Sequence, residues 1–314
     1  MIHIACCSNE KLAPIFGVVV TSIGINVTSD DVTIHLVHNS LKPRTVKRLQ
    51  KIADKYKVEL DFKQIDTDIL KDCYFDKSKH YGDIMMFARL LLSSVLPDLD
   101  KIIYLDCDIV VLKDLQSLWN LDISDVAVAM APGLTFEDKK SLNRLGMTSG
   151  YYLNSGVILM NLDYWRKHDV QNRVISYILE KGDKLIYNDQ DALNSILQNE
   201  HKVLHIKYNY SYCYFHRLIG VSHKEKIREI IEARDNPVIF HYFGPLKPWS
   251  LGCYIPGKEL FVKYQKLSGW SYKIIQKHIF KRIVYTLIPS LKSMMWENKT
   301  YIEGWENYYK NKNL

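Results

Sequence analysis

The sequence predicts an α/β fold built on a mostly parallel sheet. Short apolar, β-branched runs alternate with helical patterns from the N-terminus onward, and strands that alternate with helices form parallel sheets covered on both faces. Hydrophobic residues make up 47% of the chain and charged residues 25%, which is ordinary globular composition. The first strands are expected at residues 2–7, 32–37 and 58–65, and the helices between them at residues 15–25 and 43–57.

The length and composition indicate one elaborated domain with a C-terminal appendage. No long Pro-, Gly- or Ser-rich linker divides the 314 residues, so we expect a domain over residues 1–265 and a separate segment over residues 266–314. The net charge of +7 is too small a bias to indicate nucleic acid as a partner. Six cysteines without CxxC spacing, several of them inside apolar runs, indicate free buried thiols in a reducing compartment.

No sequence feature predicts secretion or insertion into a membrane. The N-terminus enters an apolar strand at once, without the basic region or cleavage site of a signal peptide. No uninterrupted apolar run reaches the roughly 18 to 20 residues that span a bilayer. We therefore expect a cytoplasmic protein that is soluble or peripherally bound to the cytoplasmic face of the inner membrane.

Two segments before the fourth strand carry candidate binding residues. Ser8 and Asn9 open the loop after the first strand, at the sheet edge where α/β folds bind ligands, although this loop lacks the GxGxxG and GK[ST] motifs of nucleotide-binding loops. Residues 84–96 predict a helix that is apolar on all sides except at Arg89. An arginine in such a run either reaches out to solvent or pairs with an anionic group. Arg89 can approach the same edge of the sheet.

Asp106 and Asp108 follow an apolar run at residues 102–105 that is typical of a strand buried on both faces. In an extended segment, residues i and i+2 point to the same side, so the two carboxylates can converge while Cys107 points away. Two like charges this close favour a bound cation, and oxygen ligands favour Mg²⁺ or Mn²⁺ over zinc. The alternative is a turn at Asp106 with Asp108 as a cap, but the apolar runs on both sides favour the metal site.

Further strands and helices complete the predicted core. They are expected as strands at residues 126–130 and 157–162, an amphipathic helix at residues 165–181 and a helical pattern at residues 192–197. Asn154 and Gly156 precede the second strand, where a tight turn would explain both residue types. Asp189 and Gln190 belong to an Asn-Asp-Gln-Asp cluster at residues 188–191, which exceeds what a single helix N-cap needs.

The loop that follows a strand at residues 238–240 has unusual spacing. His241, Gly244 and Lys247 recur at intervals of three residues, and two prolines stiffen the loop. A histidine at a strand end is often structural. Here the spacing can supply a metal ligand, a close backbone approach and a phosphate contact together.

Residues 272–299 combine apolar residues at helical spacing with several lysines and an arginine. Such a segment either docks on an anionic membrane surface or packs on the domain with a solvated basic face. Aromatic residues suited to a membrane interface favour docking; they are Trp296, Tyr301, Trp305, Tyr308 and Tyr309.

Four separated motifs together resemble those of glycosyltransferase family 8. They are Leu-Asp-Cys-Asp at residues 105–108, Tyr-Leu-Asn-Ser-Gly at 152–156, Asn-Asp-Gln-Asp at 188–191 and His-Tyr-Phe-Gly-Pro-Leu-Lys-Pro-Trp at 241–249. This family includes bacterial lipopolysaccharide and lipooligosaccharide galactosyl- and glucosyltransferases, and glycogenin. The resemblance extends over residues 1–265, with the motifs in matching order.

The resemblance implies a GT-A fold, which is a Rossmann-like nucleotide-diphosphosugar domain with a mixed central sheet. It implies that Asp106, Asp108 and His241 bind Mn²⁺, with Mg²⁺ as the other candidate. The implied catalytic residues near the sugar are Asn154, Asp189 and Gln190. The implied donor contacts are Ser8, Asn9, Arg89, Asp106, Cys107, Asp108, Gly244 and Lys247.

Two departures from the family concern the donor. The family has an Asp-Asp-Asn-Tyr-like sequence after its first strand that binds uridine and ribose, whereas this chain has Ser8, Asn9, Glu10 and Lys11. Residues 130–132 lack an acidic residue found in the galactosyltransferase relatives. The predicted donor is therefore UDP-glucose or UDP-galactose, and UDP is the better supported part.

The predicted function is transfer of this hexose, with retention of configuration, to a glycan or lipid-linked glycan acceptor in bacterial surface polysaccharide synthesis. A divalent metal and Lys247 would stabilise the diphosphate leaving group. Gln190 is a poor nucleophile, which favours front-face attack in which the departing phosphate oxygen takes the acceptor's proton. Two alternatives stay open: a non-catalytic nucleotide-sugar-binding protein, and a haloacid-dehalogenase-like phosphatase, whose DxDx[TV] signature resembles residues 106–110 but normally follows the first strand.

Overall fold

The alternating strands and helices at the N-terminus form the predicted βαβαβ unit in a computed structural model of the chain. Strands β1 (Ile2–Ser8), β2 (Val32–His38) and β3 (Glu59–Gln64) run parallel, with α1 (Ala13–Asn26) and α2 (Pro43–Tyr56) as the connections. The structure describes residues 1–28, 31–73, 83–133, 139–147, 151–214, 224–244, 246–250 and 255–270.

These strands belong to a seven-stranded sheet with the order β3-β2-β1-β4-β7-β6-β8. Its other strands are β4 (Lys101–Leu105), β6 (Val128–Pro132), β7 (Leu153–Asn161) and β8 (His201–Val203). β7 is antiparallel to both of its neighbours, and the other pairings are parallel. The chain passes from β3 to the far side of β1 before it forms β4. The C-terminal ends of β1 and β4 therefore meet where the strand order reverses, the usual ligand position in such sheets.

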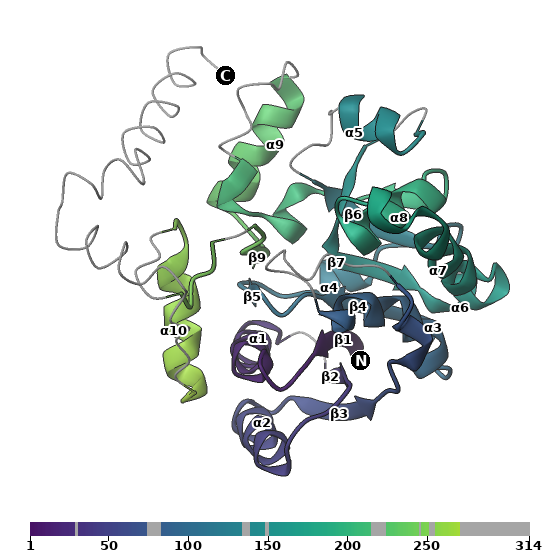
Figure 1. The fold of residues 1–314 in the computed structure, drawn as a ribbon. Coiled ribbons are helices and arrows are strands. Elements are labelled where there is room, and N and C mark those ends of the chain that lie inside the picture. Colours follow the sequence, from purple (N-terminus) through teal and green to yellow (C-terminus); the bar gives the residue numbers. More distant parts are fainter. Residues whose placement is uncertain are drawn as a thin grey trace, which may run out of the picture.

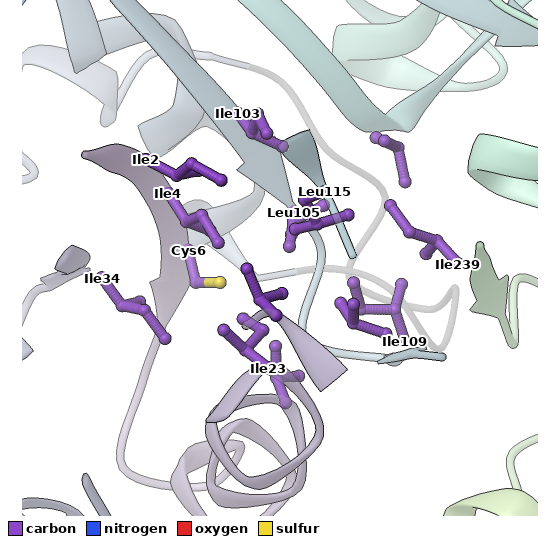
Figure 2. Close-up of a cluster of buried hydrophobic side chains, with 14 of the residues drawn as sticks. Ile2, Ile4, Cys6, Ile23, Ile34, Ile103, Leu105, Ile109, Leu115 and Ile239 are labelled. Carbon is purple, nitrogen blue, oxygen red and sulfur yellow. The ribbon is translucent and has the colours of Figure 1, made fainter. Parts of the chain in front are cut away.

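Helices cover both faces of the sheet (Figure 1): α1 and α2 on one, and α7 and α8 on the other. Figure 2 shows Ile4 and Cys6 of β1, Ile103 and Leu105 of β4, and Ile23 of α1 pointing into one buried cluster. The remaining α-helices are α3 (Leu92–Val95), α4 (Gln116–Trp119), α5 (Lys139–Arg144), α6 (Leu162–Lys167), α7 (Val170–Lys181), α8 (Asn188–Ile196), α9 (Lys224–Asp235) and α10 (Lys258–Ser268). The 3₁₀ segments are η1 (Asp68–Leu70), η2 (Ile84–Leu91), η3 (Gly182–Lys184) and η4 (Ile206–Asn209).

Three local predictions were wrong. The single helix expected at residues 84–96 is the 3₁₀ segment η2 followed by α3. Arg89 Nε donates to the Met86 carbonyl, which in an α-helix would accept from the backbone N–H four residues later. The helix expected at residues 165–181 is divided into α6 and α7, because Asp169 has a left-handed φ of 50°. The tight turn considered for Asn154 and Gly156 is replaced by strand, because both lie inside β7.

A second, two-stranded sheet brings distant parts of the chain together. β5 (Ile109–Val111) pairs antiparallel with β9 (Ile239–His241), and Ile109 lies opposite His241. The backbone N–H of Tyr242 also donates to the carbonyl of Asp108 at 2.9 Å. This register places His241 next to the carboxylates that follow β4.

The end of the described chain packs on the N-terminal helices. α10 continues through residue 265, Asn26 Nδ2 donates to the Tyr264 hydroxyl at 2.7 Å, and the Arg48 guanidinium lies 4.5 Å above the Trp270 ring. The basic amphipathic segment predicted at residues 272–299 lies outside the described residues, so its docking stays a prediction. Among the described helices, none has the length and apolar character to cross a bilayer.

Candidate active site

Asp106, Asp108 and His241 form an acidic cluster at the C-terminal end of β4. One ligand atom from each lies within 4.8 Å of the other two. His241 Nε2 is 3.2 Å from Asp108 Oδ1 and 3.8 Å from Asp106 Oδ2. The convergence expected for residues i and i+2 after a strand therefore occurs, and the β5–β9 pairing adds the imidazole.

Arg89 and Tyr104 fix the carboxylate of Asp106. Arg89 Nη2 is 2.9 Å from Asp106 Oδ1, and the Tyr104 hydroxyl donates to the same oxygen at 2.7 Å. The buried guanidinium also stacks 4.5 Å above the Tyr104 ring. Arg89 is thus paired with carboxylates and does not reach out to solvent. Because Oδ1 is held in this way, Oδ2 is the oxygen that Asp106 turns toward His241.

Asp108 is held by two cationic or potentially cationic groups. Lys247 Nζ forms an ion pair with Asp108 Oδ2 and donates to the carbonyl of Tyr242 at 2.8 Å. Although burial acts to raise it, Lys247 and His241 hold the pKa of Asp108 well below its usual range. The carboxylate therefore stays ionised at neutral pH. Gly244, between His241 and Lys247, has a φ of 99°, which side chains with a Cβ rarely adopt.

Gly156 packs directly against His241 and Asp106, two of the candidate metal ligands. A Cβ at this position would lie 2.1 Å from His241 Cε1 and 2.8 Å from Asp106 Oδ2. The backbone at Gly156 also fixes the approach of Asp106, whose N–H donates to the Gly156 carbonyl at 2.8 Å. Glycine is thus required here by close packing, and the turn considered from the sequence does not explain it.

Asn154 and Gln190 lie together at the other side of the site. Asn154 Nδ2 donates to Gln190 Oε1 at 2.9 Å, and the backbone N–H of Ser155 donates to the same oxygen at 3.2 Å. Asn194 connects α8 to β7, because its side chain accepts from the Leu153 N–H at 2.7 Å and donates to the Leu153 carbonyl at 2.8 Å. The Gln190 side chain is therefore held by two donors of β7, and Asn194 fixes α8 against the same strand.

The two aspartates around Gln190 have different surroundings. Asp189 is nearly fully buried behind Arg89, at 3.2 Å from Arg89 Nε. Burial raises the pKa of Asp189 to about 6, although the guanidinium opposes the shift. Asp191 binds Arg144 through both carboxylate oxygens, at 2.9 and 3.0 Å, and accepts from the Tyr152 hydroxyl at 2.6 Å. Asp191 thus stabilises the start of α8.

The first loop adopts a defined structure despite its departure from the family sequence. Asn9 Nδ2 donates to Asp83 Oδ2 at 2.5 Å, while Asn9 Oδ1 accepts from the Leu12 N–H at 3.0 Å. Ser8 is fully buried at the end of β1. The Cys107 thiol is also buried and contacts the Cys7 carbonyl, so its side chain faces the core and not the carboxylate cluster. Donor contacts by these residues stay predictions.

Three residues of the site were missed by sequence reasoning. Ser155 accepts from Arg89 through its carbonyl at 2.6 Å, and Tyr104 binds Asp106. The i, i+2 relation of Tyr104 to Asp106 within one strand was an available signal. Asn209, which binds His241 Nδ1 through its Oδ1 at 2.8 Å, lies in a segment without any motif and gave no signal.

Comparisons with known proteins agree with this geometry. The model of the family described as Glycosyl transferase family 8 matches residues 3–252. General stress protein A of Bacillus subtilis (strain 168) is 28% identical over 277 residues, which cover 86% of this chain and 95% of that protein. Lipopolysaccharide 1,3-galactosyltransferase of Salmonella typhimurium is 26% identical over 291 residues, covering 86% of this chain and 83% of the relative.

The solved structures show the fold. The galactosyltransferase LgtC, crystallised with donor and acceptor sugar analogues, superposes with a TM-score of 0.74 at 24% identity, covering 90% of this chain and all of that one.

The Asp-X-Asp motif follows the fourth strand, so the phosphatase alternative does not hold. The fold is GT-A, and the chain belongs to glycosyl transferase family 8.

Proposed function

We propose that the protein is a metal-dependent, retaining glycosyltransferase that moves glucose or galactose from a UDP-sugar to a glycan acceptor. The observation that carries this proposal is the cluster of Asp106, Asp108 and His241, whose ligand atoms come within 4.8 Å of one another from two separate sheets. The names of relatives add support, since several are lipopolysaccharide glucosyl- or galactosyltransferases. We infer that the acceptor is a bacterial surface glycan or its lipid-linked precursor and that the enzyme acts on the cytoplasmic side.

The residues of the cluster fit a hard divalent cation, Mn²⁺ or Mg²⁺. Two carboxylates and one imidazole nitrogen are ligand types that such ions accept. Two of the three residues pack directly against Gly156, where a Cβ would lie 2.1 Å from His241 Cε1 and 2.8 Å from Asp106 Oδ2, so the cluster needs a glycine at this position. Asp106 and Asp108 also bring two negative charges to one point, which a divalent cation would neutralise.

We call the candidate metal ligands and the two residues that follow them the metal clamp; its members are Asp106, Asp108, His241, Gly244 and Lys247. They have separate tasks in cleavage of the sugar–diphosphate bond. When bound, the cation supplies positive charge to the diphosphate oxygens as the bond breaks. Lys247, which pairs with Asp108 beside the candidate metal ligands, would donate to the same leaving group. Gly244 offers backbone without a side chain beside it, which suits close approach of a phosphate.

Gln190 is proposed to act on the sugar side of the bond. Its Oε1 is oriented by Asn154 Nδ2 and the Ser155 N–H, at 2.9 and 3.2 Å. A neutral amide is a poor nucleophile, so we propose that this oxygen stabilises positive charge developing on the sugar. The acceptor then attacks from the face that the diphosphate leaves, and a phosphate oxygen takes its proton.

A hydrolysis and transfer panel tests the proposed function. The protein is incubated with Mn²⁺ and UDP-glucose, UDP-galactose or their N-acetyl forms, and released UDP is measured, with Mg²⁺ and chelator arms. We expect Mn²⁺-dependent release of UDP from glucose or galactose donors. Metal-dependent binding of UDP without turnover of any donor would instead support the non-catalytic nucleotide-sugar-binding protein. Turnover that is unaffected by chelator would contradict the metal clamp.

Replacement of Gln190 by alanine is expected to lower kcat by about a hundredfold with little change in Kd for UDP. The reason is that an interaction made mainly in the transition state contributes to kcat and not to ground-state binding. The measurement is steady-state turnover of the best donor alongside calorimetric UDP binding. Near wild-type turnover in Gln190→Ala would contradict a role for this side chain near the reacting carbon.

A further inference from the structure

Asn209 bridges the two halves of the site, although neither half contains it in sequence. It ends the 3₁₀ segment η4 and is fully buried. Its Oδ1 lies 2.8 Å from His241 Nδ1, and its Nδ2 donates to Asn154 Oδ1 at 2.7 Å. Because Asn154 in turn binds Gln190, one continuous chain of hydrogen bonds runs from the metal-side imidazole to the sugar-side amide.

Backbone donors fix the direction of every bond in this chain. The Gly156 N–H can only donate, and it does so to Asn154 Oδ1 at 3.0 Å. Asn154 must therefore present Nδ2 to Gln190, whose bound atom is Oε1 because the Ser155 N–H donates to it as well. Both ends of the Asn154–Gln190 pair are thus set by groups that cannot reverse.

The same logic extends to the histidine. Since Asn154 offers only an oxygen to Asn209, the Asn209 amide must turn Nδ2 toward Asn154 and Oδ1 toward His241. His241 Nδ1 then donates to the Asn209 oxygen, and Nε2 faces Asp106 and Asp108. With Nδ1 engaged by Asn209, Nε2 is the nitrogen whose lone pair a metal ion held by Asp106 and Asp108 would accept.

We propose that Asn209 is a positioning residue. It keeps a proton on His241 Nδ1 and fixes the amide orientations of Asn154 and Gln190. In this way it holds the metal side and the sugar side of the site in one arrangement. This inference rests on the proposed function. It assigns to Asn209 a contribution to catalysis through other residues, without contact with the donor. Its two hydrogen bonds act on different steps, so they can be separated experimentally.

Two substitutions make the separation. Asn209→Asp keeps an oxygen that accepts from His241 Nδ1 but places a second oxygen against Asn154 Oδ1. Because the Gly156 N–H prevents the Asn154 amide from reversing, the two oxygens repel, which displaces Asn154 and disrupts its bond to Gln190. We expect Mn²⁺ affinity in the presence of UDP to stay within about threefold, because the imidazole keeps its acceptor, while kcat falls about tenfold or more. Asn209→Leu removes both bonds and is expected to weaken Mn²⁺ binding about 10- to 100-fold and also lower kcat.

The matched control is Asn161→Asp at the far end of β7. The Asn161 side chain also accepts from a backbone N–H, of Tyr164 at 2.9 Å, and donates to a carbonyl, of Ile123 at 2.9 Å. This variant also loses one amide donor to a protein oxygen, at a half-buried position, so thermal melting should report a loss of stability for both. Its kcat and Mn²⁺ affinity should stay at wild-type values.

The first readout is Mn²⁺ affinity in the presence of UDP, measured by electron paramagnetic resonance. The second is kcat at saturating metal and donor. A split between the Asp and Leu variants in metal affinity, with kcat reduced in both, supports the proposal. Wild-type kcat in Asn209→Asp, or equal losses in Asn209→Asp and Asn161→Asp, would overturn it while leaving the proposed function intact. Absence of Mn²⁺ binding by the wild-type protein would overturn both.

Discussion

Asp108→Asn is expected to abolish metal-dependent turnover, with kcat/KM lowered by about a thousandfold or more. The substitution preserves volume and removes the charge that His241 and Lys247 surround, with His241 Nε2 at 3.2 Å from Asp108 Oδ1. A neutral amide is a weak ligand for a hard cation, and a loss of about 4 kcal/mol of leaving-group stabilisation corresponds to about three orders of magnitude in rate. The measurement combines Mn²⁺ titration with turnover of the best UDP-hexose.

The control for Asp108→Asn is Asp100→Asn. Asp100 also pairs with a basic side chain, Arg166 at 2.9 Å, but its side chain is 83% exposed. It precedes β4, at the opposite end of that strand from the cluster. Surface pairs contribute little, so this variant should keep wild-type turnover. If Asp108→Asn retained turnover within about tenfold of wild type, the carboxylate would not be a metal ligand in the reaction.

Gly156→Ala is expected to eliminate Mn²⁺ binding with UDP and to reduce turnover to the level of Asp108→Asn. A single added methyl group would lie 2.1 Å from His241 Cε1, a separation that real Cβ contacts do not show, so the imidazole must leave its position. The imidazole cannot move aside without disturbing its surroundings, because it is 1% exposed and bound to Asn209, so the clash disrupts the cluster. The measurement is metal affinity by calorimetry, with folding checked by circular dichroism.

Gly24→Ala separates this local effect from general loss of stability. A Cβ at Gly24 in α1 would lie 2.5 Å from Tyr56 Cβ and 2.8 Å from Val58 Cγ2, a comparable clash away from the cluster. Overpacking of this kind destabilises a protein by about 1 to 3 kcal/mol. We expect Gly24→Ala to melt at a lower temperature yet bind Mn²⁺ as the wild type does. Retained metal affinity in Gly156→Ala would contradict the geometry of the cluster.

The sequence predicted what depends on local pattern. Alternating apolar runs indicated the parallel βαβαβ unit, and the i, i+2 spacing of Asp106 and Asp108 after an apolar strand indicated their convergence. The family motifs added His241, at the end of β9, and Gly244 and Lys247, which follow it. The sheet and the convergence of Asp106, Asp108 and His241 are confirmed, because strand periodicity and motif order are properties of short segments, whereas the donor contacts of Gly244 and Lys247 stay predictions.

What the sequence did not predict depends on pairings between distant segments. The register that sets Ile109 opposite His241 spans more than a hundred residues and has no local signature. The need for glycine at position 156 comes from side chains of β4 and β9 that approach β7, so a turn was the natural interpretation. The proposed role of Asn209 likewise depends on partners from two other strands, Asn154 of β7 and His241 of β9.

The most direct test of the metal clamp is electron spin-echo spectroscopy of Mn²⁺ and UDP bound to protein labelled with ¹⁵N-histidine. The account predicts coupling of the Mn²⁺ electron spin to a single histidine nitrogen, from His241, and loss of that coupling in His241→Gln. Mn²⁺ bound without any histidine coupling, or with coupling that persists in His241→Gln, would contradict the assignment of Asp106, Asp108 and His241 as the metal-binding cluster.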